Sequence, residues 1–330
     1  MKTILNRLFG HETLSQTEAY DVLTSISNGA HNQAQIASFL TVYMMRPITI
    51  AELSGFRQAL LDLCIRIDLS DFDTIDLCGT GGDGKNTFNI STLASLVVAS
   101  CGVKVAKHGN YGVSSVSGSS NVMEALGVKF TNDESVIKRC IDEANIAILH
   151  APLFHPAMKN VGPIRKDLGV KTFFNLLGPL VNPAFPKNQL SGVFNLELAR
   201  MYGYLLQETD VNFRVLHDLN GYDEISLTGK TKVISKKEDS IFSPSDFGLE
   251  QIRESDIYGG NTVEEAVSIF RNILEGKGTK AQNDVVCANA ALALELLHNT
   301  DKKQAFETAH EALLSGKALH TLYHIQQLTK

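Results

Sequence analysis

Residues 78–92 read Cys-Gly-Thr-Gly-Gly-Asp-Gly-Lys-Asn-Thr-Phe-Asn-Ile-Ser-Thr. The residues before them, 74–77, are typical of the end of a short strand, and the apolar run 93–99 is long enough for a buried helix. Glycine allows positive φ and a close approach of a ligand to the backbone, and a helix N-terminus presents unpaired N–H groups with a partial positive charge. This strand, loop and helix therefore predict an anion site, most often one for phosphate.

The loop fits two common glycine patterns only in part. Residues 79–84 satisfy G-x-G-x-x-G, but a dinucleotide fold needs an acidic residue about 20 positions further on. The next expected strand, 103–106, ends instead in Lys107 and His108. A P-loop needs Ser or Thr after its lysine, and Asn86 stands there. A glycine turn without a ligand is the alternative, which the asparagine and hydroxyl residues of the loop disfavour.

The composition is that of a globular α/β protein. The chain has 330 residues, enough for about two domains, and 44% are hydrophobic. The net charge of −6 argues against a non-specific nucleic-acid binder. No apolar run reaches the roughly 20 residues that span a bilayer, and no signal-peptide pattern precedes the first helix, so we expect a cytoplasmic protein with no membrane partner. The five cysteines predict neither a disulfide framework nor a zinc cluster.

The first 68 residues predict helices only. Ser15 with Glu18, and Thr49 with Glu52, form capping boxes that mark helix starts. From residue 74 onward, apolar strand patterns alternate with helical ones, which predicts a mainly parallel sheet flanked by helices. The expected strands are 74–78, 103–106, 146–149, 190–194, 213–217 and 224–227.

Proline is concentrated in one part of the chain, because six of its eight prolines lie between Pro152 and Pro186. This stretch cannot be one continuous helix. We interpret it as a crossover that returns to the helical domain and forms part of the hinge; an irregular surface loop is the alternative. We therefore expect a small all-helical domain, 1–68, joined by part of 152–186, and a larger α/β domain, 69–330.

A second polar loop, Lys107–Ser120, follows the second expected strand and holds three glycines and five serines. Its N–H groups, hydroxyls and Lys107 could surround a phosphate, although a serine-rich linker would look similar. In a parallel sheet both loops lie at one edge. Two neighbouring anion sites predict a ligand with two phosphoryl groups.

Acidic and basic side chains complete the candidate site. Asp223 and Glu224 follow the strand 213–217, where they could bind magnesium directly or through its waters. Asp83, inside the first loop, would be repelled by phosphate and suits sugar hydroxyls or a place near magnesium. Arg165 could grip a carboxylate bidentately. Paired acids on a loop and lone arginines are also common solvated surface residues.

These motifs together resemble those of the anthranilate phosphoribosyltransferases. The matching segments are GTGGDG with NIST (79–92), KHGN…VSS…SGS (107–119), HPAMKNVGPIRK with NLLGPLVNP (155–183) and GYDE (221–224). The resemblance implies transfer of phosphoribose from 5-phosphoribosyl 1-diphosphate to the amine of anthranilate in tryptophan biosynthesis, with Mg²⁺ as cofactor. It also implies a homodimer and no nucleic-acid partner.

The same resemblance implies a role for each matching residue. It assigns the donor to Gly79, Gly82, Asp83, Thr87, Asn89, Ile90, Ser91, Thr92, Lys107, His108, Gly109, Asn110, Tyr111, Gly112, Val113, Ser114, Ser115 and Ser119. It assigns magnesium to Ser91, Asp223 and Glu224. It assigns anthranilate to Asn110 and Arg165, with Gly79 close by. No covalent nucleophile or general base is expected, and Arg165 and Lys107 act by positioning.

The second loop departs from the family pattern at three positions. Tyr111 replaces a common arginine, Val116 a common lysine, and Asn121 a frequent aspartate. The loss of two cations raises a question about donor affinity. A pyrimidine nucleoside phosphorylase and a non-catalytic nucleic-acid-binding relative are the competing interpretations. Lys-His-Gly-Asn at 107–110, where a phosphorylase should read Lys-Met-Ser-Gly-Arg, and the acidic overall charge argue against them.

Overall fold

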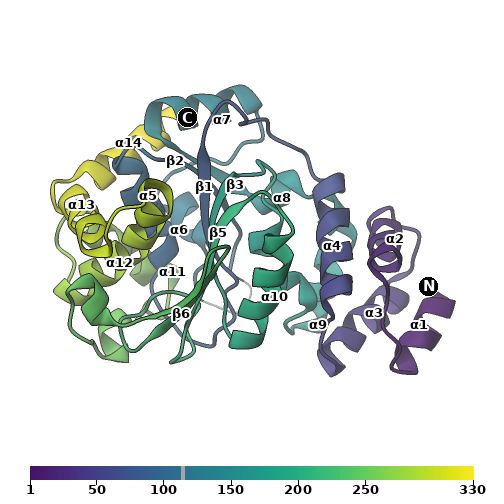
Figure 1. Ribbon diagram of the computed structural model, residues 1–330. Coiled ribbons are helices and arrows are strands. Elements are labelled where there is room, and N and C mark those ends of the chain that lie inside the picture. Colours follow the sequence, from purple (N-terminus) through teal and green to yellow (C-terminus); the bar gives the residue numbers. More distant parts are fainter. Residues whose placement is uncertain (113–115) are drawn as a thin grey trace. The chain divides into compact units, whose positions relative to one another are not determined.

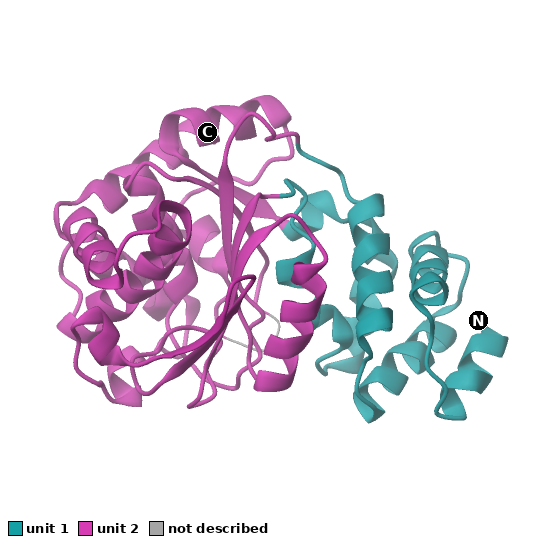
Figure 2. Ribbon diagram, viewed as in Figure 1, with its two compact units in different colours: residues 1–67, 151–185 teal, residues 68–150, 186–330 magenta. Residues whose placement is uncertain are grey.

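The computed structural model describes residues 1–112 and 116–330. The chain divides into two compact units, coloured separately in Figure 2. Unit 1 comprises Met1–Ile67 and Ala151–Phe185, and unit 2 comprises Asp68–His150 and Pro186–Lys330. One unit is helical and the other contains a mainly parallel sheet flanked by helices, so the expected fold class is confirmed.

Unit 1 is built from short helices around an aromatic core. Its elements are α1 (Lys2–Phe9), α2 (Gln16–Ser27), α3 (Gln33–Met45), α4 (Ile50–Leu63), α8 (Ala151–Phe154), η1 (Pro156–Asn160), α9 (Gly162–Leu168), η2 (Phe173–Leu176) and η3 (Gly178–Leu180). Both expected capping boxes are present, at the starts of α2 and α4. Phe56 stacks on Phe173 with ring centroids 4.5 Å apart, so the returning segment packs against the N-terminal helices.

Unit 2 contains one sheet, and its described strands have the order β3-β2-β1-β4-β5-β6-β7. The strands are β1 (Thr74–Gly79), β2 (Lys104–Gly109), β3 (Ile146–His150), β4 (Asn188–Gly192), β5 (Asn212–Asp218), β6 (Thr231–Ser235) and β7 (Asp239–Phe242). The first five in chain order run parallel, and β6 and β7 are antiparallel. The carboxyl ends of β1, β2, β4 and β5 therefore meet at one edge, where ligands of such sheets bind.

Helices cover both faces of this sheet. They are α5 (Ile90–Ser100), α6 (Ser119–Ala125), α7 (Glu134–Ala144), α10 (Leu196–Gln207), α11 (Val263–Leu274), α12 (Lys280–His298), α13 (Lys302–Leu314) and α14 (Lys317–Leu328), with η4 (Pro244–Phe247) and η5 (Glu254–Ile257) in the connections. Figure 1 shows α10 on one face and α5, α12 and α13 on the other. Among the described helices, none has the length and apolar character needed to cross a membrane.

One expected strand, 224–227, is wrong. Leu227 has a φ of 59°, in the left-handed region, so the segment cannot continue as an extended strand. The backbone of Ile225 bonds to a side chain instead of a neighbouring strand: its N–H donates to Asn289 Oδ1 (3.0 Å), and its carbonyl accepts from Asn289 Nδ2 (2.8 Å). Ile225 and Leu227 are nevertheless buried, within the connection between β5 and β6.

Candidate active site at the carboxyl edge of the sheet

The first glycine loop curls around the carboxylate of Asp223. Gly81, Gly82 and Gly84 have φ of 62°, 75° and 75°, which glycine adopts without strain. The Gly81 N–H donates to Asp223 Oδ2 at 2.6 Å, across 142 residues of sequence. A Cβ built on Gly79 would stand 2.5 Å from the same oxygen. Gly79 is therefore needed for the close approach of Asp223, and Gly81 for the turn.

Asp83 closes the turn of this loop. Its Oδ1 accepts the N–H of Lys85 at 2.9 Å, and its charge also acts on Asp223. Next along the chain, α5 begins at Ile90 with Asn89 as N-cap, and the Asn89 side chain does not cap the helix. Asn89 Nδ2 instead donates to the Ser117 carbonyl at 3.2 Å and so links the two loops. The Ile90 N–H donates to the Phe88 carbonyl (2.7 Å), and among the described residues the N–H groups of Ser91 and Thr92, which come next in α5, have no partner and can bind a ligand.

A segment that the sequence analysis missed holds the first loop from the other side. Residues 86 and 259 are linked by a bond from the Gly259 N–H to the Asn86 carbonyl (2.8 Å), and Asn86 Nδ2 donates to the Gly260 carbonyl (2.7 Å). Lys85 Nζ lies 2.9 Å from the Glu254 carboxylate and 4.6 Å from the ring centroid of Tyr222. No local motif marks residues 254–260, because their role depends on a pairing across about 170 residues.

Asp223 and Glu224 bring two acidic groups to this site. Burial raises the pKa of both carboxyls; the charge of Asp83 raises that of Asp223 further, and the charge of Asp223 raises that of Glu224. Two neighbours lower the pKa of Glu224: Ser91 forms a hydrogen bond with it, and Lys107 contributes a positive charge. A divalent cation would relieve this repulsion, and an all-oxygen donor set suits Mg²⁺, which keeps several waters.

These residues fit a metal that is completed by ligand and water oxygens. Within the described chain, no three His, Cys, Asp or Glu side chains are gathered to hold a metal by themselves. Glu224 and Ser91 line a small pocket together with Cys78 and Asn289. Burial raises the pKa of the Cys78 thiol far above its usual range, so Cys78 is a packing residue and not a nucleophile.

Lys107 occupies a position that the sequence did not predict. It is 2% exposed, and its Nζ donates to the Leu77 carbonyl at 2.5 Å. Its neighbour His108 is also buried, and the His108 N–H donates to Asp76 Oδ1 (3.2 Å). The ammonium therefore lies within the sheet, where its charge reaches the Asp223–Glu224 pair.

The second loop leaves β2 at Gly109, at the same edge of the sheet as the first. Asn110 follows, and its carbonyl accepts the Ser120 N–H (3.1 Å) and the Ser119 hydroxyl (3.4 Å). Gly112 is held by Asn121, whose Oδ1 accepts its N–H at 2.9 Å. Val113, Ser114 and Ser115 lie outside the described residues. The described donor residues of both loops therefore belong to unit 2, together with Asp223 and Glu224.

Arg165 belongs to unit 1, where it stands on α9. Its Nη2 donates to Asn175 Oδ1 (3.1 Å), and its guanidinium lies 5.3 Å from the ring centroid of Phe174. Its Nε is buried without a hydrogen-bond partner, and burial lowers its pKa. Among the described residues, no carboxylate forms an ion pair with it. A partly buried cation with an unused donor is suited to a carboxylate on a ligand.

Comparisons with known proteins agree with this geometry. Residues 2–64 match the helical bundle domain of the glycosyl transferase family, and residues 71–319 match its α/β domain. The anthranilate phosphoribosyltransferases of Flavobacterium psychrophilum and Christiangramia forsetii are 66% and 62% identical to this chain, each match covering 100% of both chains.

Solved structures give the same result at lower identity. Anthranilate phosphoribosyltransferase from Thermus thermophilus superposes with a TM-score of 0.90 at 33% identity, over 98% of each chain. The Saccharomyces cerevisiae enzyme in complex with PRPP and Mg gives 0.89 at 28% identity, over 98% of this chain and 96% of that one. The resemblance found in the sequence is therefore confirmed, and the chain belongs to the anthranilate phosphoribosyltransferase family.

Proposed function

We propose that this protein transfers the phosphoribosyl group of 5-phosphoribosyl 1-diphosphate to the amine of anthranilate, releasing diphosphate, in L-tryptophan biosynthesis. Relatives that match it over its full length carry this activity in their names, and yeast structures of the family are described with PRPP and Mg or with 4-fluoroanthranilate. One structural observation carries the proposal. Two phosphate-type loops leave adjacent parallel strands, and the buried Asp223 and half-buried Glu224 lie beside the first loop.

The loops would hold the donor by its two charged ends. The N–H groups of Ser91 and Thr92 at the start of α5 would donate to phosphate oxygens, and the glycine loop allows these oxygens to come close to the backbone. The described residues that the resemblance assigns to the donor lie in these two loops and at the adjoining ends of β1, α5, β2 and α6. Mg²⁺ would be held by Asp223, Glu224 and Ser91, and when bound it supplies Lewis-acid stabilisation of the departing diphosphate.

The transfer needs no covalent intermediate on the protein. The anthranilate nitrogen supplies the electron pair that forms the new bond to C1 of the ribose, and the diphosphate leaves with the electrons of the broken C1–O bond. The released proton passes to solvent. An arylamine is already neutral at pH 7, so a strong general base is unnecessary, and the protein contributes positioning and electrostatics. Arg165 would bind the anthranilate carboxylate and aim the amine.

Loss of anthranilate fluorescence on mixing protein, MgCl₂, 5-phosphoribosyl 1-diphosphate and anthranilate tests the proposal. We expect loss of signal only when all components are present. Phosphorolysis of a nucleoside, or a gel shift with nucleic acid, in place of this transfer would favour a competing interpretation. Absence of transfer at saturating substrates would overturn the proposal.

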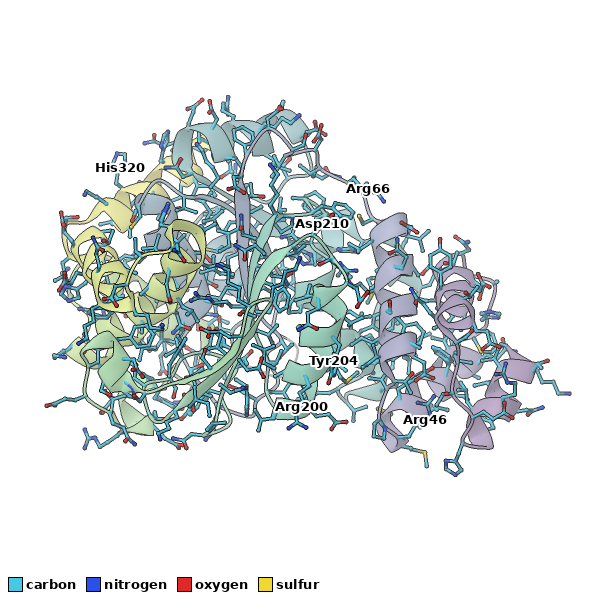
Figure 3. All side chains as sticks on the ribbon, viewed as in Figure 1. Arg46, Arg66, Arg200, Tyr204, Asp210 and His320 are labelled. Carbon is cyan, nitrogen blue, oxygen red and sulfur yellow. The ribbon has the colours of Figure 1, made fainter. Side chains whose placement is uncertain are left out.

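Replacement of Arg165 by alanine tests the role given to that residue. A hydrogen-bonded charge pair is worth about 1.5–3 kcal/mol, so the KM for anthranilate should rise about 10- to 100-fold and the KM for the donor far less. Arg200→Ala, at an exposed arginine of α10 labelled in Figure 3, is the matched control. Equal changes in both KM values would remove the assigned role.

Domain roles, assembly and location complete the proposal. We infer that residues 1–68, with part of 152–186, act as one domain and 69–330 as the donor-binding domain, which the division into compact units supports. The resemblance implies a homodimer, the net charge of −6 argues against a nucleic-acid partner, and we expect a cytoplasmic location without a membrane partner. Light scattering on the purified protein and fractionation of cells test these two points.

A further inference from the structure

The Asn121 side chain ties together the two ends of the second donor loop. Asn121 Oδ1 accepts the N–H of Gly112 and the N–H of Gly118, both at 2.9 Å. A Cβ on Gly118 would stand 2.3 Å from Gly112 N and 2.7 Å from the Asn110 carbonyl oxygen. The two ends of the segment 112–118 are therefore pinned together, so whatever fixes residues 110–112 also fixes the mouth of the loop.

Tyr111 lies beside Gly112, at one end of this loop, and its side chain is occupied by two contacts. Its ring meets the His150 ring edge-on, with centroids 4.7 Å apart and planes at 72°. Its hydroxyl lies 3.3 and 3.2 Å from the two carboxylate oxygens of Glu124, on α6. The Tyr111 N–H donates to Asn110 Oδ1 at 2.8 Å. Backbone and side chain of Tyr111 are both held.

His150 provides Tyr111 with a fixed partner. It is the last residue of β3, the strand next to β2, and it is 6% exposed. Its Nδ1 lies 2.8 Å from the Ser120 hydroxyl, and its ring stacks on Phe130 with centroids 4.5 Å apart and planes at 19°. The imidazole is thus fixed by its place at the end of β3, by Ser120 of α6 and by Phe130 between α6 and α7.

From this arrangement we propose that Tyr111 is a positioning residue that fastens the second donor loop to His150 and Glu124, in place of direct charge contact with the donor. The inference rests on the proposed function, because it concerns the loop assigned to the donor. It answers the question raised by the sequence. Tyr111 stands where the family commonly has arginine, and here the position holds the loop by packing and a charge-assisted hydrogen bond.

Three variants separate the two side-chain contacts of Tyr111, the ring contact with His150 and the hydrogen bond to Glu124. Tyr111→Phe keeps the ring on His150 and removes the bond to Glu124, Glu124→Ala removes the same bond from the other side, and Tyr111→Ala removes both contacts. We expect the KM for the donor to rise about 3- to 5-fold in each of the first two variants and about 10- to 50-fold in the third. The KM for anthranilate and kcat should change by less than about 2-fold.

Two measurements distinguish positioning from a general loss of structure. The double variant Tyr111→Phe with Glu124→Ala should resemble either single variant, because both remove one shared interaction. Amide hydrogen exchange of peptides that contain Gly112 and Gly118 should speed up in Tyr111→Ala and remain unchanged elsewhere. Tyr323→Ala is the control, because Tyr323 on α14 is a tyrosine of comparable exposure (49%, against 38% for Tyr111). It should change neither the KM for the donor nor the amide exchange of these peptides. Helix α14 carries His320, which is labelled in Figure 3.

The outcomes are decisive whether or not the proposed function holds. An unchanged donor KM in Tyr111→Ala, equal rises in both KM values, or additive effects in the double variant would each overturn the role of Tyr111. If the wild-type protein performs no transfer, the proposed function fails and the exchange measurement still decides. Unchanged exchange at Gly112 and Gly118 then refutes the fastening, and faster exchange confined to the loop supports it.

Discussion

Replacing Gly79 by alanine should displace the carboxylate on which the metal assignment depends. Gly79 is the last residue of β1, and a Cβ there would lie 2.5 Å from Asp223 Oδ2 and 3.2 Å from Asp223 Cγ. Contacts of a Cβ closer than 3.0 Å are essentially absent from real proteins, and ordinary contact begins at 3.4 Å. The carboxylate must therefore move by about 0.5–0.9 Å to admit the methyl group, an amount set by these contact limits.

This movement is large for an active site. It would also strain the 2.6 Å bond from the Gly81 N–H to the same oxygen, which shapes the first loop. A misplacement of 1 Å can cost on the order of 100-fold in rate, so kcat/KM should fall about 10- to 100-fold, equivalent to about 1.4–2.7 kcal/mol. Overpacking should also reduce the free energy of unfolding by about 1–3 kcal/mol.

The assay is the loss of anthranilate fluorescence, titrated with MgCl₂ at saturating donor. Gly203→Ala is the matched control, because its added Cβ would lie 2.9 Å from Ile234 Cγ2 and so crowds a buried side chain on β6 instead of the site. It should lower stability by at most a similar amount and leave kcat/KM and the Mg²⁺ requirement unchanged. If Gly79→Ala matches Gly203→Ala in both kinetic quantities, the position of Asp223 does not matter and the reasoning is refuted.

Three further predictions follow from buried or bridging charges. Asp223→Asn with Glu224→Gln should abolish most turnover, yet in EDTA it should raise the free energy of urea unfolding by about 1–4 kcal/mol, because it removes the repulsion between the buried Asp223 and the half-buried Glu224 carboxyl groups; a less stable variant would contradict this. Lys85→Met should raise the donor KM about 3- to 10-fold with little change in Tm, since an exposed ion pair adds at most about 1 kcal/mol to stability. An unchanged KM would show that the Glu254 contact does not hold the loop. Glu52 is buried, which raises its pKa, but bonds from Arg46 and from backbone N–H groups outweigh this and its net pKa is lowered. The stability that Glu52 contributes is complete above its ordinary pKa of 4.5 and is lost as pH falls through the lower pKa of the folded state. In Glu52→Gln the midpoint of urea unfolding should therefore depend less on pH in this acidic range. An unchanged pH dependence would contradict the role assigned to Glu52.

The local elements and the family could be read from the sequence because their signals are short-range. A capping box needs residues three apart, as at Thr49 and Glu52, and a glycine loop needs its own few residues, as at 79–84. The alternation of strand and helix patterns was then enough to predict a parallel sheet flanked by helices. The expected strand 224–227 failed because burial alone does not distinguish a strand from a buried loop; the side chain of Asn289 takes the backbone bonds of Ile225 there.

Contacts between distant residues were decided by the tertiary structure alone. The sequence placed Lys107 in a phosphate loop, whereas the fold buries its ammonium against the Leu77 carbonyl. The sequence showed only that Tyr111 replaces a common arginine of the family, whereas the pairing of β3 with β2 brings His150 into contact with its ring. Such pairs have no periodic or spaced signature, because the strand order of the sheet, and not the distance along the chain, brings their side chains together.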